Sequence, residues 1–379
     1  MDLQAELDFP EFKERVEQFC AIYCPPEQEF ELDRNPVYPE ALHQAMASSG
    51  LLSHCLPKAL GGSDGTLVEL CMINEILARH SMSATNILFI NGICAALMAM
   101  AGSPEQQETY VKGIAEGRLK FSFALTEPNA GSDAAGIQAS ATADSEGYRI
   151  NGTKLYTTGA DVADYILTAV RTDSEGKASR SVSLFIVPTA SEGLSIAPLD
   201  KIAGNDVASC QVEYRNVTVP TSARLGEENA GWSTLMLGGG LERLSVAACC
   251  IGAAQASLDE VLEHVKHRKQ FGQPVGQFQA VQHQIADMAT RLEAMNLLTY
   301  SAARKLQAGR PAVREISMAK VFAAEGAHEI ITYGMRLLGA KAYLSETAMP
   351  RRMRESFLAM YAGGTPEIQR NLIARDLGL

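Results

Sequence analysis

The pattern of apolar and polar residues along the chain is helical near the N-terminus. From Thr66 to His80, apolar residues recur at the spacing of one helical face; they are Leu67, Leu70, Cys71, Ile73, Ile76 and Leu77. Ser103-Pro104-Glu105-Gln106 has the residues of a helix start, with Ser at the N-cap, Pro in the first turn and Gln able to bond back. We therefore expect helical structure up to about residue 118.

The pattern changes to short β-rich runs between about residues 119 and 228. The runs are separated by Gly, Asp, Asn and Ser, and they are Tyr148–Ile150, Tyr165–Val170, Val182–Val187, Leu194–Ala197 and Gln211–Val219. Asn151-Gly152 is typical of a tight turn between two such runs. This region is predicted to be a small antiparallel β-domain.

Helical periodicity returns from about residue 229. Val281–Gln307 and Val313–Leu338 are long and contain few helix breakers, and Thr365-Pro366-Glu367 predicts the start of a last helix. The absence of βαβ alternation argues against a Rossmann or hydrolase sheet. We expect an α+β fold with an N-terminal helical domain (1–118), a middle antiparallel β-domain (119–228) and a C-terminal helical bundle (229–379).

Length and charge narrow the classes of protein. A chain of 379 residues, with 46% hydrophobic and 20% charged residues, fits two or three globular domains rather than a disordered or fibrous protein. Lys and Arg number 33 and Asp and Glu 44, which gives a net charge of −11. An acidic chain receives no long-range attraction to phosphate backbones, so we do not expect nucleic acid as a partner.

The N-terminus and the cysteines indicate a cytoplasmic protein. The segment MDLQAELDF is acidic and lacks the apolar region of a signal peptide. The longest strongly apolar stretch, Ile93–Ala101, is too short to span a bilayer, so no membrane segment is expected. Eight cysteines without a C-x-x-C pair suggest neither a disulfide framework nor a zinc site, so we expect reduced thiols and no metal.

One hydrolase motif occurs. Gly61-Gly62-Ser63-Asp64-Gly65 matches G-x-S-x-G, which in a nucleophile elbow follows a buried strand. Here the preceding residues include Pro57, which removes a donor from a central strand. A tight loop is therefore favoured, and a serine hydrolase using Ser63 is kept as a remote alternative.

A second motif is more specific. In Phe123–Gly136 an apolar strand ends in Thr126-Glu127 and is followed by a Gly-Ser-Asp turn, which offers N–H groups and a hydroxyl to an anion. The run ALTEPNAGSDAAG resembles the first signature of the acyl-CoA dehydrogenase family of flavoproteins. Asn151–Thr158 is similar to the second flavin segment of that family, and Arg268–Gly272 with Val275–Gln279 is a third match. The resemblance covers almost the entire chain.

The resemblance implies an FAD site. Tyr156 stands where Trp is common and is expected to pack on the isoalloxazine, with Thr126 bonding the ring and Thr158 near N5. Arg268 is expected to reach the pyrophosphate of a neighbouring subunit's FAD. The full set that the resemblance assigns to FAD is Phe123, Leu125, Thr126, Gly131, Ser132, Tyr156, Thr158, Arg268, Phe271, Gln279, Arg336, Gly339, Thr365 and Glu367.

The position of the catalytic base departs from the common family pattern. Most members place a Glu directly before Gly-Thr near the C-terminus, and this chain has Gly363 there. It resembles instead the isovaleryl-CoA and long-chain enzymes, which carry the Glu on an earlier helix. That position is Glu242, whose apolar neighbours suit a carboxylate with a raised pKa. The alternative is a solvent-facing carboxylate paired with an arginine.

Other site residues follow from the same resemblance. Gly363 is expected to keep a catalytic role through its backbone N–H, which would bind the thioester oxygen. Ser132, Arg243 and Tyr361 are expected to contact the substrate. The implied reaction is α,β-dehydrogenation of an acyl thioester, with Glu242 as α-proton base and hydride transfer to flavin N5.

Further departures leave the substrate open. Arg336, Ala340 and Ala342 alter the family's second signature, and Gly240 stands where an Asp touching the pantetheine arm is common. Acyl-CoA is the expected substrate; an acyl or aminoacyl group on a carrier protein, or a reaction resembling that of crotonobetainyl-CoA reductase, are the alternatives. A non-catalytic flavoprotein that binds nucleic acid is disfavoured by charge. The family resemblance further implies electron-transferring flavoprotein as acceptor and a homotetramer or homodimer.

Overall fold

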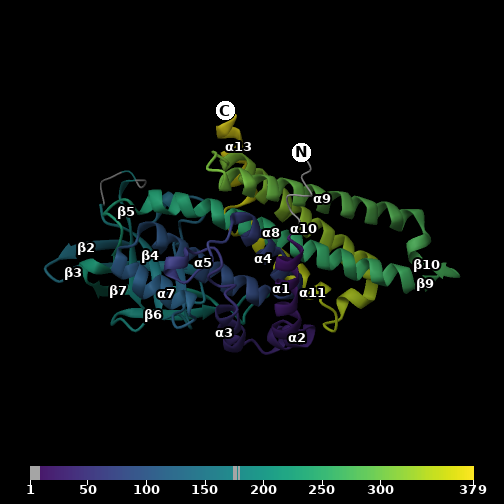
Figure 1. The fold of residues 1–379 in the computed structure, drawn as a ribbon, viewed down its shortest axis with the longest axis horizontal. Helices are drawn as coiled ribbons and strands as arrows, with labels where there is room; N and C mark the ends of the chain where they lie inside the picture. Colours follow the sequence, from purple (N-terminus) through teal and green to yellow (C-terminus); the bar gives the residue numbers. More distant parts are fainter. Residues whose placement is uncertain (1–8, 174–176, 178–179) are drawn as a thin grey trace. The chain divides into compact units, whose positions relative to one another are not determined.

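The computed structural model describes residues 9–173, 177 and 180–379 (Figure 1). Residues 1–8, which carry most of the acidic N-terminal segment considered above, lie outside the described residues. The chain forms two compact units: unit 1 comprises Met1–Arg34, Thr66–Thr85 and Arg243–Leu379, and unit 2 comprises Asn35–Gly65 and Asn86–Glu242. These units combine segments from different parts of the sequence, and the domain boundaries expected at residues 118 and 228 stay predictions.

Unit 1 is helical. Its helices are α1 (Pro10–Tyr23), α2 (Pro26–Arg34), α4 (Leu67–His80), α9 (Gln279–Gln307), α10 (Val313–Leu338), α11 (Met349–Ser356), α12 (Leu358–Tyr361) and α13 (Pro366–Asp376). Two further helices, α5 (Met82–Ala101) and α8 (Gly231–His267), begin in one unit and end in the other. A short hairpin of β9 (Lys269–Gln270) and β10 (Gln273–Pro274) connects α8 to α9 (Figure 1).

Helices α4, α10 and α13 of unit 1 begin where the sequence pattern placed them. Thr66 caps α4 and forms a reciprocal capping box with Glu69, and Thr365 caps α13 by accepting from the N–H of Ile368. The predicted helix Val313–Leu338 is α10. Close packing fixes how α4 and α8 meet, because a Cβ at Gly252 would lie 2.0 Å from the carbonyl oxygen of Glu75.

Unit 2 is built on a mixed sheet. Its strands are β1 (Phe121–Ala124), β2 (Ser140–Asp144), β3 (Gly147–Thr158), β4 (Tyr165–Arg171), β5 (Val182–Pro188), β6 (Leu194–Leu199), β7 (Ser209–Val219) and β8 (Arg224–Leu225). The order is β6-β7-β3-β2-β4-β5-β8, with β1 paired to β4. Most pairs are antiparallel, as expected, but β1 and β2 pair with β4 in parallel.

The helices of unit 2 are α3 (Glu40–Ser48), α6 (Pro104–Gln106) and α7 (Lys112–Ala115). The predicted start at Ser103 is confirmed, since Ser103 and Gln106 form a capping box; the chain then continues as a π-helical turn over Gln107–Val111. The sheet's core is an apolar cluster that includes Ile150, Phe185, Val212 and Val217, all inaccessible to solvent.

The prediction of a turn at Asn151-Gly152 is wrong. These residues lie inside β3, which runs without interruption from Gly147 to Thr158, and the pairing with β7 shifts register between Ile150 and Gly152. Gly152 has φ +142°, and a Cβ there would lie 2.4 Å from Cβ of Ala139. Gly152 therefore allows a β-bulge in β3 and a close approach to Ala139, and it does not form a hairpin turn. The hairpin between β2 and β3 is at Asp144, whose carboxylate accepts from the N–H groups of Glu146 and Gly147.

Two helices of the described residues, α5 and α8, are long and apolar enough to cross a membrane by length and composition alone. The apolar stretch Ile93–Ala101 is thus the C-terminal part of α5, a helix of 20 residues. The apolar windows of α5 and α8 are 56% and 61% buried within the chain, as in helices that form part of a protein core. The expectation that the chain has no membrane segment stays a prediction.

Candidate active site

The loop that follows β1 in unit 2 is fastened by one buried carboxylate. Glu127 is 8% exposed, and its two oxygens accept from the N–H groups of Gln138, at 2.7 Å, and Ala139, at 2.9 Å. Its own backbone N–H and carbonyl bond to Ala130. The Glu127 carboxylate therefore ties the start of the Thr126–Asp133 run to Gln138 and Ala139, which follow the run.

Lys154 of β3 completes this arrangement. Its side chain is fully buried, and its ammonium donates to the Glu127 carboxylate at 2.7 Å and to the carbonyl oxygen of Leu125 at 2.9 Å. Burial lowers the pKa of Lys154 to about 8, and the Glu127 charge partly opposes this shift. One buried ion pair thus holds the β1 loop against the middle of β3.

The segment of β3 beyond Lys154 directs an aromatic ring outward. The register with β7 shifts between Lys154 and Thr157, and Tyr156 within this bulge has φ +58° and is 64% exposed. The N–H of Leu155 donates to the carbonyl of Thr126 at 2.8 Å, and the hydroxyl of Ser122 donates to the carbonyl of Thr158 at 2.6 Å. The structure therefore brings the segments that carry Thr126, Tyr156 and Thr158 together.

These groups suit the flat, hydrogen-bonding ring system of a flavin. An exposed aromatic face at Tyr156 lies on the strand beside Thr126 and Thr158, both half-buried, while Gly131 and Ser132 lie exposed in the loop. A Cβ at Gly131 would meet no atom within 4 Å, so the chain leaves open space there. Phe123 and Leu125 are half-buried at the end of β1. The FAD residues predicted in unit 2 thus lie on β1, the loop after it and β3, and their contact with FAD stays a prediction.

A second group of predicted site residues lies in unit 1, at the turn before α13. Gly363 and Gly364 have φ of +67° and +93°, values that favour glycine. The Gly363 carbonyl accepts from Nε2 of Gln369 at 2.8 Å and from Nε of Arg243 at 3.4 Å. The Gly364 carbonyl accepts from the fully buried ammonium of Lys320 at 2.6 Å and from Gln369 at 3.2 Å.

Other predicted residues surround this turn or lie apart from it. Thr365 caps α13, Glu367 is exposed in its first turn, and Tyr361 is 63% exposed at the end of α12. Glu242 is half-buried on α8, and buried apolar side chains follow it: Leu244, Val246, Ala247 and Ala248. The assignment of each to the site stays a prediction.

The hairpin residues form a third group, also in unit 1. Phe271 has φ +52° and is 94% exposed, packing its ring edge against Phe278, and Arg268 and Gln279 are exposed on either side. Arg336 and Gly339, at the end of α10, are exposed as well. Among the described residues of unit 1, no hydrogen bond links Arg268, Phe271 or Gln279 to the Gly363 turn. Their contact with a neighbouring subunit's FAD stays a prediction.

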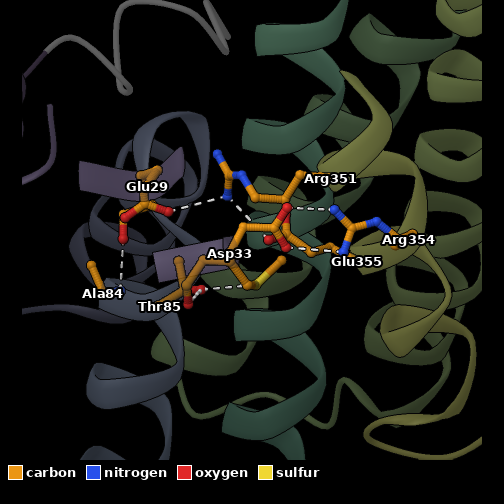
Figure 2. A network of polar contacts seen from close by, with 9 residues as sticks. Glu29, Asp33, Ala84, Thr85, Arg351, Arg354 and Glu355 are labelled. Carbon is orange, nitrogen blue, oxygen red and sulfur yellow. Dashed lines mark hydrogen bonds and ion pairs between the residues drawn. The ribbon is translucent and has the colours of Figure 1, made fainter. Parts of the chain in front are cut away.

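Arg351 and Glu355 of α11 have largely buried side chains and a structural role. Figure 2 shows them in a polar network with α2: Arg351 pairs with Glu29 at 3.1 Å and Glu355 at 3.0 Å, and Arg354 pairs with Asp33 through two bonds. Glu29 and Arg351 are both at most 8% exposed. This network anchors α11, the helix that leads toward the Gly363 turn, to α2.

Four polar residues that hold these loops were missed by the sequence analysis: Glu127, Lys154, Lys320 and Gln369. A signal existed for Lys320, since it lies among the buried positions Ile316, Ala319, Ala323 and Ala324 of α10. A lysine within such an apolar face must find a polar partner. Lys154 and Glu127 are 27 residues apart and Lys320 and Gly364 are 44 apart, so spacing could not identify these partners.

The G-x-S-x-G segment is a loop, as favoured. Lys58–Leu60 forms a 3₁₀ turn where a nucleophile elbow would need a strand, and Gly61 has φ +86°. Gly65 packs so closely on His54 that a Cβ would lie 2.4 Å from its ring. The glycines therefore fit a compact loop, and Ser63 has no elbow.

Comparison with known proteins agrees with the resemblance seen in the sequence. Three family descriptions match consecutive parts of the chain: the acyl-CoA dehydrogenase N-terminal domain over residues 8–118, the middle domain over 122–217 and the C-terminal domain over 229–378. The chain is 36% identical over 346 residues to the caffeyl-CoA reductase-Etf complex subunit CarC of Acetobacterium woodii, covering 91% of each chain.

Two other similar proteins span the same range. The chain is 35% identical over 349 residues to a 3-(aryl)acrylate reductase of Clostridium sporogenes, covering 92% of each chain. The solved structure of butyryl-CoA dehydrogenase from Megasphaera elsdenii superimposes with a TM-score of 0.93 at 28% identity, covering 100% of this chain and 99% of that one. The α, β, α order and these matches over nearly the whole length lead to one conclusion: the chain belongs to the acyl-CoA dehydrogenase family, FAD-dependent oxidoreductases that act on the CH–CH bond of acyl thioesters.

Proposed function

We propose that this enzyme interconverts an acyl-CoA and its α,β-unsaturated form, with Glu242 as the residue that exchanges the α proton. One observation carries this assignment. The C-terminal position used for the base by most members is Gly363, and the residue whose side chain reaches the Gly363 carbonyl is Arg243, the chain neighbour of Glu242. Gly363 has no side chain to act as a base, and Glu242 is the carboxylate that the family resemblance offers in its place.

Each group has a distinct task in this proposal. Glu242 takes the α proton, and buried apolar residues follow it on α8. The backbone N–H of Gly363 donates a hydrogen bond to the thioester oxygen and stabilises the negative charge that develops there. Bound FAD supplies the acceptor for the β hydrogen. Tyr156, Thr126 and Thr158 would hold the flavin ring, and Ser132 its phosphate side.

Substitution of Glu242 by Gln tests the base. We expect E242Q to retain FAD and to lose α-proton exchange by at least about 100-fold, since general acid–base catalysis contributes roughly 10² to 10⁴. Exchange is measured by deuterium incorporation into the acyl thioester in D₂O. The matched control is Glu263→Gln, another α8 carboxylate with a 76% exposed side chain. Normal exchange by E242Q would exclude this residue as the base.

The reducing direction is a second candidate, because the two relatives from Clostridium sporogenes and Acetobacterium woodii are named reductases. The same groups serve it, since Glu242 would then deliver the proton to Cα. Anaerobic flavin absorbance distinguishes the directions: saturated thioesters that bleach the flavin indicate oxidation, and enoyl thioesters that restore colour to the reduced enzyme indicate reduction. A panel of CoA and carrier-protein thioesters in the same assay identifies the carrier.

We further propose electron-transferring flavoprotein as the electron partner, a homotetramer or homodimer as the assembly, and the cytoplasm as the location. The name of the Acetobacterium relative, a subunit of a reductase-Etf complex, supports the first of these. The exposed Phe271 hairpin supports the second, because an aromatic side chain at 94% exposure gains stability when a second chain covers it. Sedimentation of the holoenzyme alone and with electron-transferring flavoprotein tests both.

A further inference from the structure

The turn Gly363–Gly364–Thr365 is held by side chains that bind its carbonyl groups from inside unit 1. Lys320 of α10 donates to the Gly364 carbonyl at 2.6 Å, and Gln369 of α13 donates to both glycine carbonyls, at 2.8 and 3.2 Å. Lys320 and Gln369 are both fully buried. Two adjacent carbonyls are therefore fixed toward the interior by two donors that cannot exchange with solvent.

Fixing the carbonyls also fixes the amides. In a trans peptide the N–H points opposite to the C=O, so two inward carbonyls turn the N–H groups of Gly364 and Thr365 away from Lys320 and Gln369. The N–H of Gly363 belongs to the preceding peptide, and the backbone angles of Gly363, with φ +67°, set its direction relative to the fixed Gly363 carbonyl. Among the described residues of unit 1, no hydrogen bond takes up the N–H of Gly363 or Gly364. The turn consequently presents backbone donors whose direction is set by the side chains behind it.

The lysine contributes charge as well as position. A hydrogen bond from an ammonium to a carbonyl is about twice as strong as a neutral one, and it polarises the peptide group that it binds. The hydrogen bond from the Lys320 ammonium to the Gly364 carbonyl, at 2.6 Å, offsets part of the cost of burying this charge. An uncharged side chain would hold the backbone with less force.

We propose that Lys320 and Gln369 are positioning residues that hold the Gly363–Gly364 turn so that its amides stabilise the enolate-like oxygen of the bound thioester. The inference rests on the proposed function of this turn. Neither residue touches the reacting atoms; both act through the backbone. Transition-state charge stabilisation depends on donors that are already oriented before the charge develops, and these two side chains supply that orientation.

The test uses the FAD-loaded enzyme with Lys320→Met and Gln369→Met, which keep side-chain length and remove the donors. We expect kcat to fall by about 10- to 100-fold with KM changed less than about threefold, because one lost oxyanion donor costs about 10² to 10³. Lys305→Met is the matched control, since Lys305 lies on α9 and pairs with Glu315. FAD content and the urea midpoint are measured for each variant.

A second readout does not depend on turnover. Acetoacetyl-CoA, a β-ketoacyl thioester, forms an enolate whose own absorbance reports how strongly the site stabilises the oxyanion. We expect the bound enolate fraction to fall about tenfold in both variants and to stay unchanged in Lys305→Met.

The outcomes separate the two hypotheses. A wild-type enzyme that neither turns over nor binds any acyl thioester overturns the proposed function and this inference with it. An active wild type whose variants keep kcat and enolate binding overturns the inference alone. Loss of enolate binding only in proportion to lost FAD or lost folded protein assigns Lys320 and Gln369 a merely structural role, and overturns it too.

Discussion

Two loops of this enzyme, one in each unit, are held by a fully buried lysine, and the two lysines use different partners. Lys154 in unit 2 pairs with the Glu127 carboxylate at 2.7 Å and also bonds the Leu125 carbonyl. Lys320 in unit 1 bonds the Gly364 carbonyl at 2.6 Å, and Gln369 shares that carbonyl. The first lysine fastens a loop through an ion pair; the second fastens one through peptide dipoles.

The difference predicts unequal consequences when each lysine is removed. Without Lys154, the Glu127 carboxylate keeps its bonds to two N–H groups but stays buried without an opposing charge. Without Lys320, the Gly364 carbonyl keeps the Gln369 amide as donor. We call the two donors to the Gly364 carbonyl, Lys320 and Gln369, the clamp. Removing one partner of a buried ion pair should therefore destabilise the fold more than removing one donor of the clamp.

The largest effect on stability is expected from Lys154→Met. Breaking a buried ion pair by removing one partner costs about 3–5 kcal/mol, against about 1–3 kcal/mol for one unsatisfied buried polar group at Lys320→Met. Urea unfolding of the two variants measures the difference. The double variant Lys154→Met with Glu127→Gln should recover part of the loss, since it removes the stranded charge. Equal destabilisation by Lys154→Met and the surface control Lys305→Met would contradict this comparison.

Two glycines give an intermediate test. At Gly152 a Cβ would meet backbone and side-chain atoms of Ala139 at 2.7 and 2.4 Å, so Gly152→Ala must move β2 and should cost about 1–3 kcal/mol. At Gly364 a Cβ would lie 2.9 Å from Nε2 of Gln369, the end of a side chain. Gly364→Ala, at φ +93°, should cost about 1 kcal/mol but lower kcat, because it displaces the clamp. The pair is compared by unfolding midpoint and kcat; unchanged kcat in Gly364→Ala would count against the clamp.

The smallest effect is expected at a solvent-accessible ion pair, which provides the reference for both buried lysines. The hydrogen bond from Lys305 is the main cause that lowers the pKa of Glu315 from 4.5 to about 2. A carboxylate with a depressed folded pKa stabilises the protein above pH 4.5, and this contribution is lost as pH falls toward 2. Glu315→Gln should therefore cost about 0.5–1 kcal/mol near pH 7 and nothing near pH 2. Urea midpoints across this range check it; a difference that grows toward pH 2 would refute the assignment.

The sequence by itself determined the element order and much of the local structure. Local patterns specify helices, strands and family without distant contacts. They include the capping boxes at Thr66 and Ser103, the helical periodicity of Val313–Leu338 and the motifs around Thr126 and Tyr156. Asn151-Gly152 shows where local pattern fails. The same dipeptide permits a turn or a bulge, and its pairing with β7 and its closeness to Ala139 decide for the bulge.

Only the tertiary structure decided how the site loops are held. Lys154 and Glu127 are 27 residues apart, Lys320 and Gly364 are 44 apart, and Arg243 and Gly363 are 120 apart. A buried charge must find a partner, but the sequence does not say which carbonyl or carboxylate the packing of strands and helices will bring within reach. The motifs that identify this family are short and local. The contacts that hold the site loops join residues far apart in sequence, and they are strong because their donors are buried away from water.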